Sequence, residues 1–377
     1  MGLRFALFLL VLSALLSSCL FSPEPFDEEQ WRKEVLAQDG SALHAPHEKD
    51  GIFFNPWMSG AEDRFLKFFK WRLSASAEYT EEEETYLPRL IPDTMARIKA
   101  LPPGDNFLVW IGHATFLLRI DGLYWLTDPM LSDRALLPKR LTSPALTKEE
   151  LSDLDGPLTV IISHNHYDHL DTDSLRALPD QARIFVPLGL GAFVQSVHPG
   201  EVTELDWWHQ AEIGNALLTC LPAQHWSRRI GQGRNTTLWA SWIIQFGELT
   251  VYYGGDSGYF VGYREIGKQF PGIDYALLPT TAYQPRWFMH YPHINVEEAI
   301  EAFNDLQASR FIPTQWGTFR LGDNPPGLPM LELERLIEKR GLDSSRYVRP
   351  ALGEIVPLAK TKNDSRENIR PHPAYNP

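Results

Sequence analysis

The chain has 377 residues, of which 44% are hydrophobic and 12% aromatic, enough apolar material for a large buried core. Its formal net charge of −13 argues against a nucleic-acid partner, because a nucleic-acid binder needs a basic track along the phosphates. We therefore expect a globular protein that binds no nucleic acid.

Residues 1–18 have the pattern of an export signal. Arg4 precedes an apolar run, 5–16, that is too short to span a membrane. The sequence Leu16-Ser-Ser-Cys19 resembles a bacterial lipobox, which implies cleavage before Cys19 and acylation of its thiol. An ordinary secretory signal with an incidental cysteine is the alternative. Leu20 after the cysteine favours the periplasmic side of the outer membrane over the inner membrane.

Three further regions divide the rest of the chain. Residues 19–50 are polar, charged and proline-containing, so we expect a lipid-attached tether with little fixed structure. Residues 51–359 are expected to form the folded domain, and the polar tail 360–377 to be flexible. Within the domain, Phe65–Arg72 mixes aromatic and basic residues. This favours either an amphipathic segment at a lipid surface or simple packing on the core.

Strand and helix patterns alternate along the domain, which is typical of a layered α/β fold. We expect helices at 172–178, 296–306 and 328–339, the first capped by Asp171 or Thr172. The expected strands are 107–111, 115–120, 124–127, 158–163, 182–187, 216–222, 239–246, 249–253, 275–279 and 310–314.

The most informative feature is His-Asn-His-Tyr-Asp-His at 164–169, between an expected strand and an expected helix. Open α/β sheets place their sites at the carboxyl ends of strands. Residues two apart in an extended loop point to the same side, so His164 and His166 are expected to bind one cation while Asp168 and His169 turn toward a second. Imidazole and carboxylate are zinc ligands. A solvated polar turn is the alternative.

At this point the chain resembles the metallo-β-lactamase superfamily, whose signature is H-x-H-x-D-H. The stretches 110–116, 126–129, 254–259 and 283–288 resemble one branch, the phospholipases D that hydrolyse N-acylphosphatidylethanolamine and their bacterial relatives. This resemblance covers about residues 55–355 and implies a four-layer αββα sandwich.

The resemblance also assigns roles outside the motif. It implies that His225 is the third histidine ligand and that Asp256 bridges two cations. A histidine is the final ligand in the family, in a His-Trp-Gly-Thr context, but this chain has Gln315 there, and an amide is a poorer zinc donor. We therefore expect one firm zinc site and a second site that is weak or takes a harder ion such as Mn²⁺ or Fe²⁺.

Other polar residues are expected to support the site. By resemblance, His293 lies near a substrate phosphate and can donate a hydrogen bond or a proton. Asp168 or Asp256 would orient the attacking water. His113 and Asp128 are expected to orient ligands rather than contact metal.

The function that this pattern favours is zinc-dependent hydrolysis of a phosphodiester in a phospholipid or another small molecule, by a protein attached to a membrane through its lipid anchor. Two alternatives stay open. One is a lactonase or carboxyl-ester hydrolase. The other is a catalytically impaired lipoprotein that keeps one structural metal.

Overall fold

The computed structural model describes residues 23–58, 64–74 and 76–358. The predicted export signal, Cys19 and the tail 360–377 lie outside the described residues.

The first of two large sheets has seven strands in the order β15-β3-β4-β5-β6-β7-β8. The pairs from β15 to β5 are antiparallel, and those from β5 to β8 are parallel. The bounds are β3 Phe107–Gly112, β4 Thr115–Ile120, β5 Leu123–Thr127, β6 Leu158–Ile161, β7 Arg183–Pro187, β8 Val202–Leu205 and β15 Ile355–Pro357.

The second large sheet has six strands in the order β14-β13-β12-β11-β10-β9. Its antiparallel part runs from β9 to β12, and β12, β13 and β14 are parallel. The bounds are β9 Gln210–Ile213, β10 Ala216–Leu221, β11 Ser241–Phe246, β12 Leu249–Tyr253, β13 Tyr275–Pro279 and β14 Arg310–Thr314. A separate two-stranded sheet pairs β1, Glu48–Lys49, with β2, Ile52–Phe53.

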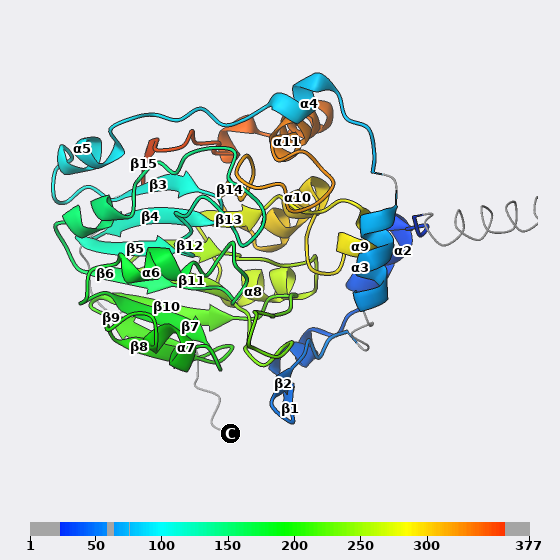
Figure 1. Cartoon of the computed structure of the whole chain (residues 1–377), viewed down its shortest axis with the longest axis horizontal. Helices are drawn as coiled ribbons and strands as arrows, with labels where there is room; N and C mark the ends of the chain where they lie inside the picture. The colour runs from blue at the N-terminus through cyan, green and yellow to red at the C-terminus, as the bar shows by residue number, and fades with distance from the viewer. Residues whose placement is uncertain (1–22, 59–63, 75, 359–377) are drawn as a thin grey trace, which may run out of the picture.

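The two sheets stack on each other because their strands are apolar on both faces. In β3, Leu108 and Trp110 pack with residues of the second sheet such as Trp242, while Phe107 and Val109 belong to a cluster on the outer face. Helices cover both outer faces, and Figure 1 shows them around the central strands. The predicted αββα sandwich is therefore confirmed.

The helices fall into three sets. On the first sheet lie α5 Thr94–Lys99, α6 Thr172–Arg176 and α7 Gly191–Gln195, and on the second α8 Gly262–Gln269, α10 Val296–Asp305 and α11 Leu328–Arg340. The third set comprises α2 Glu28–Leu36, α3 Arg64–Leu73, α4 Glu81–Thr85 and α9 Arg286–Met289. Short 3₁₀ turns occupy Gly40–His44, Glu149–Asp153 and Ser344–Arg346. In Figure 1, α3 and α9 lie side by side at one end of the molecule.

The expectation of little fixed structure before residue 51 was wrong for residues 23–50. Asp27 caps α2, whose Trp31 and Val35 are buried in the main core. Trp31 Nε1 donates to Glu298 Oε1 over 3.0 Å, and Glu28 pairs with Arg286 over 2.7 Å. Burial of the Trp31 side chain holds this otherwise polar segment on the core, so the segment is part of the folded domain.

The segment 65–72 forms most of α3, and part of it packs on the core, as one of the two readings expects. Trp71 is buried and stacks on Phe288, with ring centroids 5.1 Å apart. Leu66, Phe68 and Phe69 stay 73%, 44% and 49% exposed, so the other face of α3 is an uncovered apolar surface. Across the described ranges, no helix has both the length and the apolar character that a membrane crossing requires.

Candidate metal centre

The motif 164–169 lies in the loop between β6 and α6, at the carboxyl end of a parallel strand. Asp171 caps α6, as the sequence predicts. Buried Arg229 donates through Nη1 to the carbonyl oxygens of Asn165 and Leu170, over 3.1 and 2.9 Å. One guanidinium thus fixes the loop on both sides of its histidines.

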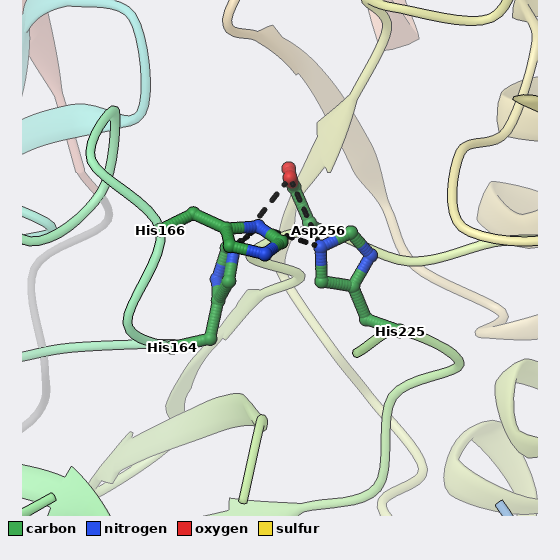
Figure 2. A group of neighbouring side chains, drawn as sticks. All are labelled: His164, His166, His225 and Asp256. Carbon is green, nitrogen blue, oxygen red and sulfur yellow. Dashed lines mark hydrogen bonds and ion pairs between the residues drawn. The ribbon is translucent and has the colours of Figure 1, made fainter. Parts of the chain in front are cut away.

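Four side chains from distant parts of the chain converge on one point, and we call them the first group: His164, His166, His225 and Asp256. Figure 2 shows their polar ends turned toward one another. His166 Nδ1 lies 2.8 Å from His164 Nε2 and 3.2 Å from His225 Nε2. Asp256 Oδ2 lies 3.8 and 3.5 Å from the same two Nε2 atoms.

Hydrogen bonds outside the first group leave bare nitrogen lone pairs inside it. His225 Nδ1 faces the carbonyl oxygen of Pro292 at 3.0 Å, so Nδ1 carries the proton and Nε2 carries none. The same holds for His164, whose Nδ1 lies 2.9 Å from Ser163 Oγ, because that hydroxyl donates its own hydrogen to Asp128. Converging acceptors repel one another unless a cation lies among them. This donor set therefore fits a zinc-type ion.

A second group consists of His113, Asp168 and His169. Asp168 Oδ2 lies 3.1 Å from His113 Nε2 and 3.4 Å from His169 Nε2. The sequence assigned His113 a supporting role, whereas the structure brings its ring nitrogen into the group. His113 directly follows β3 and faces the motif across the first sheet's end, a proximity that local sequence does not reveal.

Asp256 lies between the two groups. Its Oδ2 faces the first group, and its Oδ1 lies 3.3 Å from His169 Nε2 of the second. Gly255 precedes it with φ +56°, and a Cβ there would lie 2.5 Å from the Cβ of Ser163. The glycine thus lets the Asp256 backbone approach the histidine loop, and the carboxylate is placed to bridge two cations.

Gln315 also reaches Asp256, but with its donor. Its Nε2 donates to Asp256 Oδ1 over 2.7 Å and to the carbonyl oxygen of Gly255 over 3.1 Å. The amide therefore fixes the position of the Asp256 carboxylate through Oδ1.

The buried carboxylate of Asp128 supports both groups. It accepts from Ser163 N, Ser163 Oγ and His169 Nδ1, each over 2.6 Å, and from the hydroxyl of Tyr253. Because His169 Nδ1 donates in this bond, Nε2 is the ring atom that faces Asp168 and Asp256. Asp128 thus sets the orientation of one ligand-type ring and the hydroxyl that supports another.

Burial is the main cause of the low basicity of the first group's histidines. It lowers the pKa of His164 and His225 well below the usual value and the pKa of His166 to about 4. Neighbouring imidazoles add to the effect in all three cases. All three rings are neutral at neutral pH, the form that binds a metal ion.

The carboxylates have the opposite character. Burial raises the pKa of Asp168 and of Asp256, but nearby imidazoles, His169 first, outweigh it and hold both pKa values well below the usual range. Burial also lowers the pKa of His169, yet Asp256, Asp168 and Asp128 outweigh it and raise that pKa well above normal. The second group therefore favours positive charge at its centre.

His293 and His290, both downstream of Asp256, differ in position. His293 Nδ1 lies 4.0 Å from Asp256 Oδ2, and its ring centroid lies 5.3 Å from that of His225. His290 instead stacks on Phe26, with centroids 4.4 Å apart, away from both groups. Only His293 of this pair lines the cavity that leads to the site.

That cavity has a volume of about 800 Å³, and His166, Asp168 and Asp256 form part of its wall. Most of the remaining wall is apolar, and three arginine side chains complete it. The apolar residues include Phe68, Phe69, Trp71, Leu136, Leu137, Ile230 and Phe288, and the cations are Arg228, Arg229 and Arg234. Sequence reasoning missed this arginine segment, although its basic run follows His225 closely in an acidic chain.

Comparison with known proteins supports this assignment of the fold. Residues 124–316 match the model of the beta-lactamase superfamily domain. An uncharacterised protein of Mycobacterium tuberculosis is 40% identical over 361 residues, covering 90% of this chain and 91% of that protein. An N-acyl-phosphatidylethanolamine-hydrolyzing phospholipase D of Caenorhabditis elegans is 36% identical over 269 residues, covering 66% of this chain and 75% of that enzyme.

Among solved structures, Igni18, a metallo hydrolase from Ignicoccus hospitalis, is similar in fold with a TM-score of 0.52 and 21% identity. The match covers 67% of this chain and 98% of that one. The chain belongs to the metallo-β-lactamase superfamily, in the branch of the phospholipases D that hydrolyse N-acylphosphatidylethanolamine.

Proposed function

We propose that this metal-dependent hydrolase cleaves a phosphodiester bond in an amphiphilic, phospholipid-like substrate. The observation that carries the proposal is the cavity, whose wall includes residues of the metal centre, many apolar side chains and three arginines. A phosphodiester needs positive charge around its oxygens, and an acyl chain needs an apolar surface. The name of the Caenorhabditis elegans relative supports the same substrate class.

The site supports this chemistry through residues with distinct tasks. A cation held by the first group, which we propose is Zn²⁺, would supply Lewis acidity and make water nucleophilic near neutral pH. The pKa values of Asp168 and Asp256 lie well below the usual range, so one of these ionised carboxylates would orient that water. His293 lies on the cavity wall beside Asp256, from where it can donate to a phosphoryl oxygen.

The arginines near the opening add a reason to expect an anionic substrate. Arg228 is exposed, and the guanidinium of Arg234 lies 5.7 Å from the ring centre of Trp226, which in turn packs on His166. The whole chain has a net charge of −13 and repels anions. Arg228 and Arg234 would locally attract an anion toward the metal centre.

The test is hydrolysis in H₂¹⁸O of three substrates: bis-p-nitrophenyl phosphate, a phospholipid presented in vesicles and an aliphatic lactone. We expect turnover of both phosphodiesters, with ¹⁸O in the phosphate-containing product, because attack occurs at phosphorus. Turnover of the lactone alone, or a lipid product with ¹⁸O only in a carboxylate, would contradict the proposal and favour carboxyl-ester hydrolysis.

We also propose that the protein is a lipoprotein whose anchor holds the cavity near a bilayer. Glu24 pairs with Lys67 and Lys70 of α3 over 3.6 and 3.2 Å. A lipid on Cys19 would lie at most about 18 Å along the chain from Glu24, at 3.6 Å per residue. The exposed apolar side chains of α3 lie on the same helix as these two lysines, and a lipid surface would cover them.

Replacing Cys19 with serine tests the anchor. We expect the variant to move from the membrane fraction to the soluble fraction after export, and the wild-type protein to carry the mass of acyl chains. A Ser18→Ala variant serves as a neighbouring control. Unchanged fractionation of Cys19→Ser, together with an unmodified wild-type mass, would show that residues 1–18 act as an ordinary secretory signal.

A further inference from the structure

We propose that His113 supplies the imidazole that position 315 lacks, and that Gln315 acts instead as a positioning residue for Asp256. This inference rests on the metal dependence of the proposed function and is independent of its substrate. It replaces a weak second site by one with two imidazoles, from His113 and His169, and two carboxylates, from Asp168 and Asp256.

The backbone around His113 is built to hold the ring in one place. His113 N donates to Thr318 Oγ1 over 2.9 Å, and its carbonyl oxygen accepts from Gln315 N over 3.0 Å. His113 and Gln315 both have positive φ, +51° and +73°, which is uncommon for residues other than glycine. Strained backbone of this kind persists where the surrounding structure fixes it, often at functional sites. The two positions are therefore tied together as one unit.

The ring of His113 reaches the second group through Nε2. Both ring nitrogens face acceptors: Nδ1 lies 3.3 Å from the carbonyl oxygen of Gln315, and Nε2 lies 3.1 Å from Asp168 Oδ2. The ring is completely buried, and its ligand-type nitrogen lies within one cluster with Asp168 and His169. With its proton on Nδ1, where the Gln315 carbonyl oxygen accepts it, His113 would offer the Nε2 lone pair to a cation bound by Asp168.

The partners of His113 are arranged in the same way. Asp128 accepts from Nδ1 of His169, so His169 Nε2 is the atom that faces the second group, 3.4 Å from Asp168 Oδ2 and 3.3 Å from Asp256 Oδ1. A cation bound there would take the place of the Nε2 proton that the carboxylates favour. Two imidazole nitrogens and two carboxylate oxygens thus surround one small region. This set suits zinc and equally manganese or iron, since it combines imidazole and carboxylate.

Gln315 uses its amide nitrogen as a donor at the site. Its Nε2 donates to Asp256 Oδ1, and an amide nitrogen used as a donor has no lone pair for a metal. An ionised carboxylate oxygen accepts this hydrogen bond and still binds a cation. Gln315 therefore orients the bridging carboxylate, the kind of supporting contact whose loss typically weakens metal binding by about 10–100-fold.

The experiment is metal counting by mass spectrometry after reconstitution with Zn²⁺, with affinities from titration calorimetry. We expect two ions per wild-type chain and one per His113→Gln chain. The double variant His113→Gln/Gln315→His should regain the second ion, because it returns an imidazole to the family's usual position. Gln315→Ala should keep two ions but bind the second about 10–100-fold more weakly.

Circular dichroism of each variant checks folding, and His209→Gln, an exposed histidine remote from both groups in sequence, is the matched control. A folded His113→Gln protein that binds two ions with wild-type affinity would show that His113 only pairs with Asp168. One ion in the saturated wild type would contradict this inference alone. Two ions without phosphodiester turnover would contradict the proposed function alone.

Discussion

Replacing His166 with alanine is expected to remove the metal ion of the first group and to abolish hydrolysis. His166 Nδ1 is the atom on which the other two imidazoles converge, at 2.8 and 3.2 Å. The loss of groups that only support ligands costs about 10–100-fold in metal affinity, so the loss of a ligand itself should cost at least about 100-fold. Turnover should fall in parallel, because both the Lewis acid and the reactive water depend on that ion.

The measurement is zinc content and phosphodiesterase activity of the purified variant beside wild type and His209→Ala. The control removes an exposed histidine from the same sheet-bearing domain and should leave both quantities unchanged. Because bound metal stabilises the folded state, thermal unfolding should be compared on metal-free samples, where the two proteins should differ little. A His166→Ala protein with wild-type zinc content would overturn the assignment of the first group.

The strands that surround the site could be predicted from the sequence because they are buried on both faces. Continuous apolar runs without polar alternation include Val109 and Trp110 in one strand and Ile243 and Ile244 in another. Such runs indicate a buried strand from the sequence alone. The strands β8 and β9 were missed for the converse reason. They are short, lie at sheet edges, and mix half-exposed polar residues with few apolar ones, so their patterns are weak.

For the N-terminal region, contacts with distant segments limited what could be predicted from the sequence. The polar composition of this region predicted a tether. The structure instead buries the Trp31 side chain, whose indole donates to the buried carboxyl group of Glu298, and α2 thereby packs on the core. The free energy gained by burying one large aromatic side chain outweighs the preference of the neighbouring polar residues for water. Nothing in residues 23–50 alone identifies the partner, which lies 267 positions away.

The residues of the candidate site also fall into those that local sequence predicts and those that only the fold brings together. His164, His166, Asp168 and His169 could be read from local spacing, since one loop carries them all. His113 could not, because its approach to Asp168 depends on how β3 and β6 are placed in one sheet, three positions apart in strand order. Gln315 was recognised as a departure from the family pattern, but its contact with Asp256 depends on the same tertiary arrangement.

Replacing Asp128 with alanine is the second large effect that we expect, and it acts on stability as well as on the metal centre. The carboxylate is completely buried and accepts from Ser163 N, Ser163 Oγ, His169 Nδ1 and Tyr253 Oη. Its removal leaves Ser163 N, Ser163 Oγ and His169 Nδ1 without this acceptor in a site that water does not reach, while Tyr253 Oη keeps only its longer bond to the carbonyl oxygen of Ala114. Breaking one partner of such a buried network costs about 3–5 kcal/mol of the free energy of unfolding.

The matched control is Asp153→Ala, which removes an exposed carboxylate that pairs with Lys99 over 3.0 Å. An exposed pair contributes about 0–1 kcal/mol, so this control should unfold almost as the wild type does. The measurement is urea unfolding of metal-free protein, which keeps metal binding out of the comparison. A second readout is the affinity for the second ion, which should fall because His169 loses the bond that fixes its Nδ1 proton and its ring. If Asp128→Ala and Asp153→Ala unfold at the same urea concentration, the Asp128 network does not hold the histidine loop in place.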